Sequence, residues 1–210
     1  MISERIGQWV RRYMLHVGQW LARAGLTANM ATLIGLLLNA GVAAVIATGE
    51  LRLGGVLLLF ASAFDMVDGA IARATGSTSR FGGFFDSTID RYSEVVVYLG
   101  LLIWINRTGD DDVGSVLILI AASGALLISY ARARAEAIGY GASVGLVARP
   151  ERVILLALCL IIDQPLWALW ALAIATHVTA ITRIVHVWRL AEKDEKAAGG
   201  SAAGTASVNE

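Results

Sequence analysis

The chain has 210 residues, of which 57% are hydrophobic and only 16% are charged, and its mean hydropathy is +0.66. A soluble domain carries about a quarter charged residues, so this composition excludes an ordinary soluble protein and indicates one polytopic membrane domain. The formal net charge is zero, and we expect no nucleic-acid partner. A single cysteine, Cys159, excludes an intramolecular disulfide framework and is expected only to pack in its apolar run.

Residues 3–23 place apolar side chains, including Trp9 and Trp20, at helical spacing, with arginines largely between them. Such a pattern is typical of an amphipathic helix that lies in the membrane interface. We therefore expect an interfacial helix over residues 1–24, although a helix packed on a soluble partner would show the same pattern.

Six apolar segments follow, each near the roughly 20 residues that span a hydrocarbon core. They lie near 30–49, 53–74, 83–106, 113–135, 150–163 and 166–190. The fold class predicted is an all-α membrane protein, with an interfacial helix and a six-helix bundle over residues 30–190 in a membrane domain ending at residue 192. The small and polar residues 193–210 predict a disordered tail.

The basic residues are distributed unevenly along this predicted topology. With a cytoplasmic N-terminus, the outer loops would hold only Arg52 and Arg107, and every other Lys or Arg would lie on the inner side. The positive-inside rule therefore favours a multi-pass protein of the cell membrane with a cytoplasmic N-terminus.

The most informative segment is 65–90, DMVDGAIARATGSTSRFGGFFDSTID, which carries Asp65, Asp68, Asp86 and Asp90. The segments on both sides of it are apolar enough to lie in a membrane. Carboxylates at membrane depth are costly and usually mark a functional site. Asp65 and Asp68 are three residues apart and are expected to share one face of the second membrane helix, and Asp86 and Asp90 share one face of the third. Four converging carboxylates without His or Cys predict hard divalent cations, Mg²⁺ or Mn²⁺.

Small and basic residues accompany these acids. Gly69 and Ala72 leave room beside the carboxylates, and the guanidinium of Arg73 suits phosphate oxygens. Cations, an arginine and open space together indicate a diphosphate site with its active side at the cytoplasmic face. A cation transporter that uses the same acids is the alternative of another class; its sites usually lie near the bilayer midplane, on broken helices.

The segment resembles the signature of the CDP-alcohol phosphotransferase family, D-x-x-D-G-x-x-A-R-x8-G-x3-D-x3-D. All fixed positions match, namely Asp65, Asp68, Gly69, Ala72, Arg73, Gly82, Asp86 and Asp90. The resemblance implies six transmembrane helices, an interfacial N-terminal helix and a homodimer.

The resemblance also implies roles for individual residues. Two metal ions would be bound by Asp65, Asp68, Asp86 and Asp90, and Asp90 would also act as general base. The CDP-linked lipid, such as CDP-diacylglycerol, would contact Asn29, Thr32, Gly69, Arg73 and Ser79. The usual proline before Asn29 is replaced by Ala28. The reaction implied transfers a phosphatidyl or archaetidyl group to an acceptor hydroxyl and releases CMP.

A cluster of arginines indicates an acceptor that bears a phosphate of its own. Arg132 lies in SYARARAE, Arg152 in ARPER and Arg183 in the last membrane segment. These runs are similar to those of prokaryotic phosphatidylinositol phosphate and archaetidylinositol phosphate synthases, which implies inositol 1-phosphate as acceptor. Glycerol 3-phosphate is the alternative. Two positions depart from that pattern, since Arg132 replaces the usual Lys and Ala148 the usual Glu.

Overall fold

The computed structural model describes residues 15–109 and 112–206, and within them it contains helices and no strands. Residues 15–23 form the first described helix, so the predicted interfacial element is helical there, and residues 1–14 lie outside the described part. The remaining helices are α2 (Ala28–Ala47), α3 (Leu51–Phe64), α4 (Met66–Thr75), α5 (Arg80–Thr108), α6 (Asp112–Ala137), α7 (Arg149–Ile161) and α8 (Pro165–Ala206).

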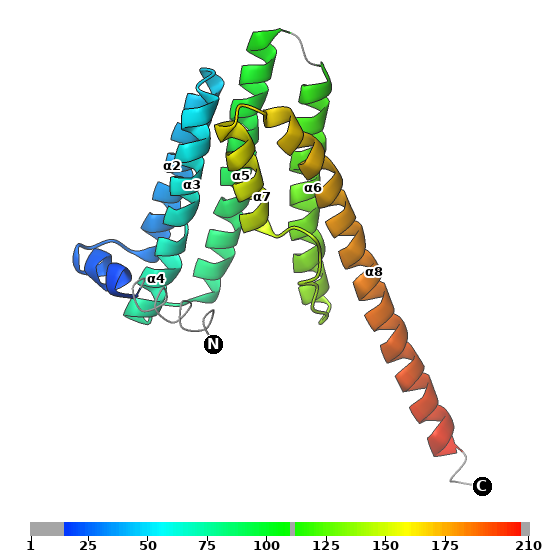
Figure 1. Cartoon of the computed structure of the whole chain (residues 1–210). Helices are drawn as coiled ribbons and strands as arrows, with labels where there is room; N and C mark the ends of the chain where they lie inside the picture. The colour runs from blue at the N-terminus through cyan, green and yellow to red at the C-terminus, as the bar shows by residue number, and fades with distance from the viewer. Residues whose placement is uncertain (1–14, 110–111, 207–210) are drawn as a thin grey trace, which may run out of the picture.

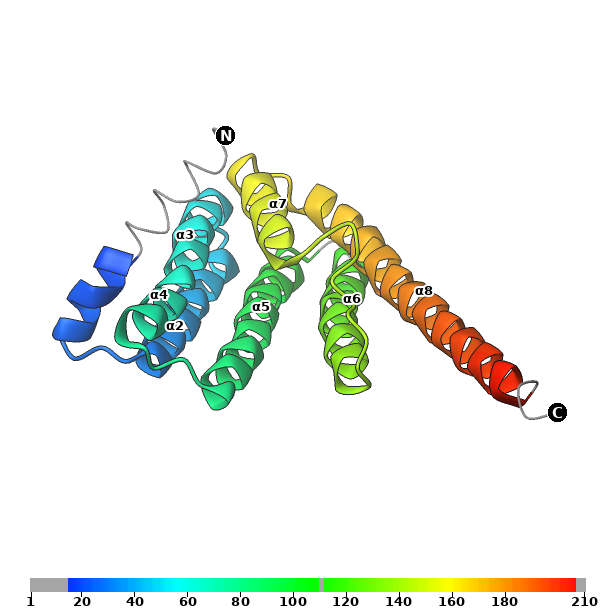
Figure 2. The same cartoon turned by 90° about the horizontal axis from the view of Figure 1, so that it is seen from below.

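Figure 1 shows these helices running up and down, with the helix of residues 15–23, α4 and the α4–α5 turn at one end of the bundle. The turns from α2 to α3 and from α7 to α8 lie at the opposite end. Seen along the bundle in Figure 2, the helices form a row in which residues 15–23 lie at one edge and α8 at the other. The principal contacts join α2 with α5, α3 with α7, and α6 with α8.

The core of the bundle is apolar, and its exterior is apolar as well. Ile46, Leu101 and Leu160 are fully buried in one cluster that joins α2, α5 and α7. On the outside, Leu37, Phe60 and Leu119 each expose 70% of their surface. Large exposed apolar surfaces of this kind mark contact with lipid or another protein.

Four helical stretches are long and apolar enough to cross a membrane, namely Ala28–Ala47, Leu51–Thr75, Asp112–Ala137 and Pro165–Lys196. Four of the six membrane spans expected from the sequence thus have the length and apolar composition of a membrane-crossing helix. The other two segments exist as helices, but α5 carries Asp86, Asp90, Arg91 and Glu94, and α7 has only 13 residues.

α7 is short because a non-helical segment, residues 138–148, precedes it and contacts α8. The hydroxyl of Thr179 on α8 accepts hydrogen bonds from the backbone N–H groups of Leu146 and Val147, and Nε of Arg183 donates to the carbonyl oxygen of Val144 at 3.0 Å. Backbone groups outside helices need such partners where they are withdrawn from water.

Residues 193–206, which the sequence places in a disordered tail, are helical in the structure. α8 continues without a break to Ala206. An ion pair between Lys196 and Glu192, one turn apart, and the alanines that follow favour the helix. Residues 207–210 lie outside the described part.

Close helix contacts depend on glycine at particular positions. A Cβ atom at Gly100 of α5 would lie 2.5 Å from the carbonyl oxygen of Ala43 on α2, whereas one at Gly83 of the same helix would meet nothing within 4 Å. We expect Gly100→Ala to destabilise the protein by about 2 kcal/mol because the two backbones must separate. The matched Gly83→Ala change should leave thermal unfolding in detergent unchanged or shift it upward; equal midpoints for the two variants would contradict this packing.

Candidate active site

A cavity of about 580 Å³ opens where α2 and α5 begin and where α4 ends. Its walls include both acidic and small residues from these three helices. Those predicted from the sequence that line it are Asn29, Thr32, Asp68, Gly69, Ser79 and Asp86. Leu26, next to the helix of residues 15–23, closes one side. The structure therefore brings together predicted site residues that are up to 57 positions apart in the chain.

Two helix N-termini border this cavity. Thr27 caps α2 by accepting a hydrogen bond from the N–H of Met30, and Ser79 caps α5 by accepting one from the N–H of Gly82 at 2.9 Å. Unpaired N–H groups and the helix dipole make such ends favourable for anions. The cavity thus combines a preference for phosphate groups with acidic side chains that suit cations.

Asp68 and Asp86 supply the acidic side of the cavity. The hydroxyl of Thr32 donates a hydrogen bond of 2.8 Å to Asp68, which is buried. Asp86 on α5 lies close enough to interact with Asp68. Arg73 does not line the cavity, but its guanidinium lies over Gly69, where a Cβ atom would stand 3.1 Å from Nη1. A side chain at position 69 would therefore push against the guanidinium of Arg73.

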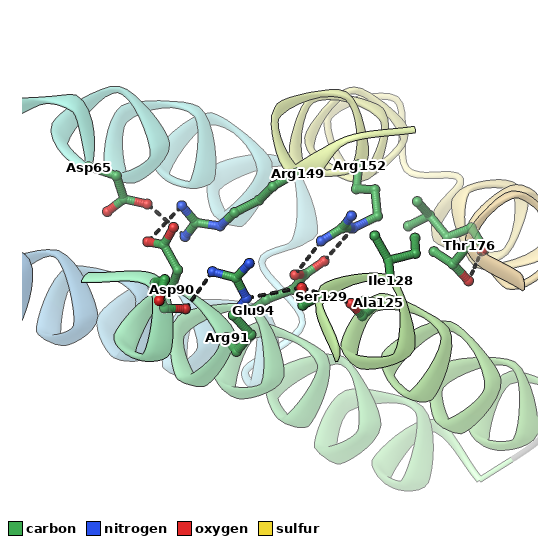
Figure 3. A network of polar contacts seen from close by, with 12 residues as sticks. Asp65, Asp90, Arg91, Glu94, Ala125, Ile128, Ser129, Arg149, Arg152 and Thr176 are labelled. Atoms are coloured by element: carbon green, nitrogen blue, oxygen red, sulfur yellow. Dashed lines mark hydrogen bonds and ion pairs between the residues drawn. The ribbon is translucent and has the colours of Figure 1, made fainter. Parts of the chain in front are cut away.

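Asp65 and Asp90 face a different partner. Arg149, in the first turn of α7, lies between them, with Nη2 at 2.9 Å from Asp65 and Nη1 at 2.8 Å from Asp90 (Figure 3). The helix is interrupted at Asp65, which joins α3 to α4. Asp65 and Asp68 lie within electrostatic range of each other, but Asp65 pairs with Arg149 whereas Asp68 lines the large cavity.

The donor set fits a hard divalent cation, since the four aspartates offer only oxygen atoms. Among the described residues, however, no three or more acidic, His or Cys side chains are placed to hold one ion. The reason is local: the guanidinium of Arg149 engages two of the four carboxylates.

A second arginine–carboxylate pair joins α7 to α5 beside the first. Arg152 donates from Nε and Nη2 to the two oxygens of Glu94, both at 2.8 Å, and the arginine side chain is only 3% exposed. Figure 3 shows this pair alongside the contacts of Arg149. Arg91 extends the polar network to α6 by donating from Nε to the hydroxyl of Ser129 at 3.0 Å.

The three arginines predicted to bind the acceptor do not line the large cavity. Arg132 is exposed and pairs with Glu136, Arg152 pairs with Glu94, and Arg183 is buried, with Nη1 donating to the carbonyl oxygen of Ile128 at 2.7 Å. Arg183 nevertheless lies within electrostatic range of both others. They form one basic region, but hydrogen bonds within the protein occupy each of them.

Two residues of this network had no role in the sequence analysis. Arg149 lies three positions before Arg152, and Glu94 lies four after Asp90. Their helical spacing from predicted site residues is a signal in the sequence, but their partners lie on other helices, which spacing alone does not reveal.

Comparison with known proteins identifies the family. Residues 25–188 match the family model for CDP-alcohol phosphatidyltransferase. Phosphatidylinositol phosphate synthase of Mycobacterium tuberculosis is 36% identical over 182 residues, covering 82% of this chain and 84% of that protein. Archaetidylinositol phosphate synthase of Methanothermobacter thermautotrophicus is 35% identical over 173 residues, covering 80% and 86%.

Solved structures of the M. tuberculosis enzyme have the same fold. The crystal structure with CDP-DAG bound has a TM-score of 0.80 at 33% identity and covers 84% of this chain and 94% of its own. The structure in complex with manganese and citrate has a TM-score of 0.79, covering 83% and 88%. The chain belongs to the CDP-alcohol phosphatidyltransferase family, and it is therefore a transferase of phospholipid biosynthesis. Family membership leaves no support for the cation transporter.

Proposed function

We propose that this enzyme transfers a phosphatidyl or archaetidyl group from a CDP-linked lipid to a hydroxyl of a phosphorylated polyol, releasing CMP. The single observation that carries the proposal is the cavity that joins Asp68 and Asp86 to the N-termini of α2 and α5. The anion-binding helix ends would receive the diphosphate, with Arg73 beside Gly69 as a further phosphate ligand.

The acidic residues would have two roles, metal binding and proton transfer. Asp65, Asp68, Asp86 and Asp90 would hold two divalent ions, Mg²⁺ or Mn²⁺, which when bound neutralise the diphosphate and stabilise CMP as leaving group. Asp90 would take the proton of the acceptor hydroxyl. The freed oxygen then forms a bond to the phosphorus that carries the lipid, and the bond from that phosphorus to CMP breaks.

Other residues would position the CDP-linked lipid. Asn29 and Thr32 stand on the first turns of α2, and Ser79 on the cap of α5, around the opening of the cavity. Hydroxyl and amide groups at these places suit the hydrogen-bonding atoms of a nucleotide. The CDP-DAG found in the relative supports a nucleotide lipid as the donor.

Inositol 1-phosphate is the acceptor we propose first, because the similar proteins are named for inositol phosphate products. Arg132, Arg152 and Arg183 form the basic region that would bind its phosphate. Glycerol 3-phosphate is the second candidate, since it too carries a phosphate beside a hydroxyl.

In the membrane, we propose that α5 and α7 complete a six-span bundle, with the N-terminus and the active site at the cytoplasmic face and the helix of residues 15–23 in the interface. The cavity lies at the end of the bundle that holds this helix and α4 (Figure 1). A water-soluble acceptor and a lipid-anchored donor would meet there. A homodimer is the assembly we expect.

The direct test supplies the purified protein, in detergent with Mg²⁺, with CDP-diacylglycerol and one of four acceptors: inositol 1-phosphate, glycerol 3-phosphate, inositol or serine. CMP release with inositol 1-phosphate, and its loss on chelation of the metal, is the expected result. Consumption of glycerol 3-phosphate instead would select the second candidate, and activity with unphosphorylated inositol alone would contradict the proposal.

A further inference from the structure

The guanidinium of Arg149 occupies the centre of the carboxylate site. It binds one oxygen of Asp65 and one of Asp90, and its buried Nε has no hydrogen-bond partner among the described residues. The other oxygen of Asp65 lies against Gly35 of α2, where a Cβ atom would come within 2.7 Å of it. The backbone of α2 therefore limits how far Asp65 can turn away from Arg149.

Arg149 and a divalent cation would compete for the same oxygens. Our inference rests on the proposed function in that it takes Asp65 and Asp90 to be cation ligands. A carboxylate that faces a guanidinium is poorly placed to bind an ion, because the two positive charges repel at short range. Asp68 and Asp86 face the cavity instead. Only Asp65 and Asp90 would therefore have to leave Arg149 before they could bind a cation.

A displaced Arg149 would need another anion, since its side chain is only 23% exposed and an unpaired charge in such a place is costly. Arg149 and Arg152 are three residues apart in the first turn of α7, so their side chains emerge on neighbouring faces. Both carboxylate oxygens of Glu94 already accept hydrogen bonds from Arg152, so Glu94 is not a free partner for Arg149. Asp86 lies within electrostatic range of Arg149, but it is itself a proposed cation ligand, so the anion that pairs with a displaced Arg149 would come from outside the chain.

We propose that Arg149 is a specificity-determining residue that exchanges Asp65 and Asp90 for the phosphate group of the acceptor. Binding of the cation to the carboxylates and binding of the phosphorylated acceptor are then linked, because each stabilises the same position of Arg149. An unphosphorylated polyol leaves the displaced guanidinium without a partner. Arg149 thus favours a phosphorylated acceptor over a free polyol, although it does not take part in the chemical step.

The experiment measures Mn²⁺ binding to the full chain in detergent by electron paramagnetic resonance. Arg149→Gln should lower the Kd for Mn²⁺ by at least about tenfold, because it removes a competing charge. Adding inositol 1-phosphate should tighten Mn²⁺ binding to the wild type but not to Arg149→Gln. Arg52→Gln is the matched control, since Arg52 forms an exposed ion pair with Asp163 at 3.6 Å at the opposite end of the bundle and should not change either result.

Unchanged or weaker Mn²⁺ binding in a folded Arg149→Gln protein would overturn the inference and leave Arg149 as a group that merely joins three helices. If that variant does not fold, Arg149→Lys serves instead: a lysine reaches one carboxylate rather than two, so it should bind Mn²⁺ more tightly than the wild type, and an unaltered Kd again overturns the inference. Asp86→Asn tests the proposed function separately, because the ion pairs of Arg149 among the described residues are with Asp65 and Asp90 and not with Asp86. If Asp86→Asn and the wild type bind Mn²⁺ equally, the proposed cation site itself is wrong.

Discussion

Replacing Asp90 with asparagine is expected to reduce CMP release by at least about a thousandfold, because an amide of the same size cannot accept the proton of the acceptor hydroxyl. Asp90 stands on α5 with its side chain 20% exposed, next to Arg149 and one turn beyond Asp86. It is close to the cavity yet shielded from bulk water, as a general base should be. The rate should be measured with saturating CDP-lipid and acceptor.

A matched control separates chemistry from folding. Asp163→Asn makes the same chemical change in the turn between α7 and α8, at the opposite end of the bundle, where the backbone has a φ of 62° that asparagine tolerates. This variant should keep wild-type activity, and both variants should give monodisperse protein in detergent. If Asp90→Asn retained activity within about tenfold of the wild type, below the span expected for a general base, the base would have to be another residue.

Much of the cavity could be predicted because its aspartates stand out in an apolar sequence and because the resemblance to the family signature implies roles for Asn29, Thr32, Gly69 and Ser79. Thr27 and Ser79 are favourable caps, Thr32 lies three residues after Asn29, and Asp68 directly precedes Gly69. Short-range stereochemistry thus determines which side chains surround the opening. The apolar segments of the sequence predicted most helix boundaries to within a few residues.

The arrangement of the charged pairs could not be predicted in the same way. Arg149 and Asp65 are separated by 84 positions, and Arg152 and Glu94 by 58. Helical spacing shows which residues share a face, but the choice between facing a cavity and facing an arginine depends on how α7 packs on α3 and α5. That packing in turn depends on the non-helical residues that Thr179 and Arg183 hold.

The pair of Glu94 and Arg152 raises the question of whether Arg152 binds substrate or only joins helices. Glu94→Ala would leave the guanidinium, which is 3% exposed, without either carboxylate oxygen. We expect a loss of about 3–5 kcal/mol in unfolding free energy, because an uncompensated buried charge costs more than the pair contributes. A large fall in the thermal midpoint, measured in detergent, should report this loss.

The double variant Glu94→Leu with Arg152→Leu resolves the two roles. Removing both charges together should restore most of the stability lost in Glu94→Ala, since apolar side chains of similar size often replace a buried ion pair without cost. If Arg152 also binds the acceptor phosphate, the restored protein should still show a KM for inositol 1-phosphate raised by at least about tenfold, because the loss of a charged hydrogen bond is worth about 1.5–3 kcal/mol. Its KM for CDP-diacylglycerol should stay near the wild-type value, because Arg152 does not line the large cavity. A stable double variant with a normal KM for inositol 1-phosphate would show that Arg152 only holds α7 against α5, and the acceptor site would then have to be built from Arg132, Arg183 and Arg149 without it.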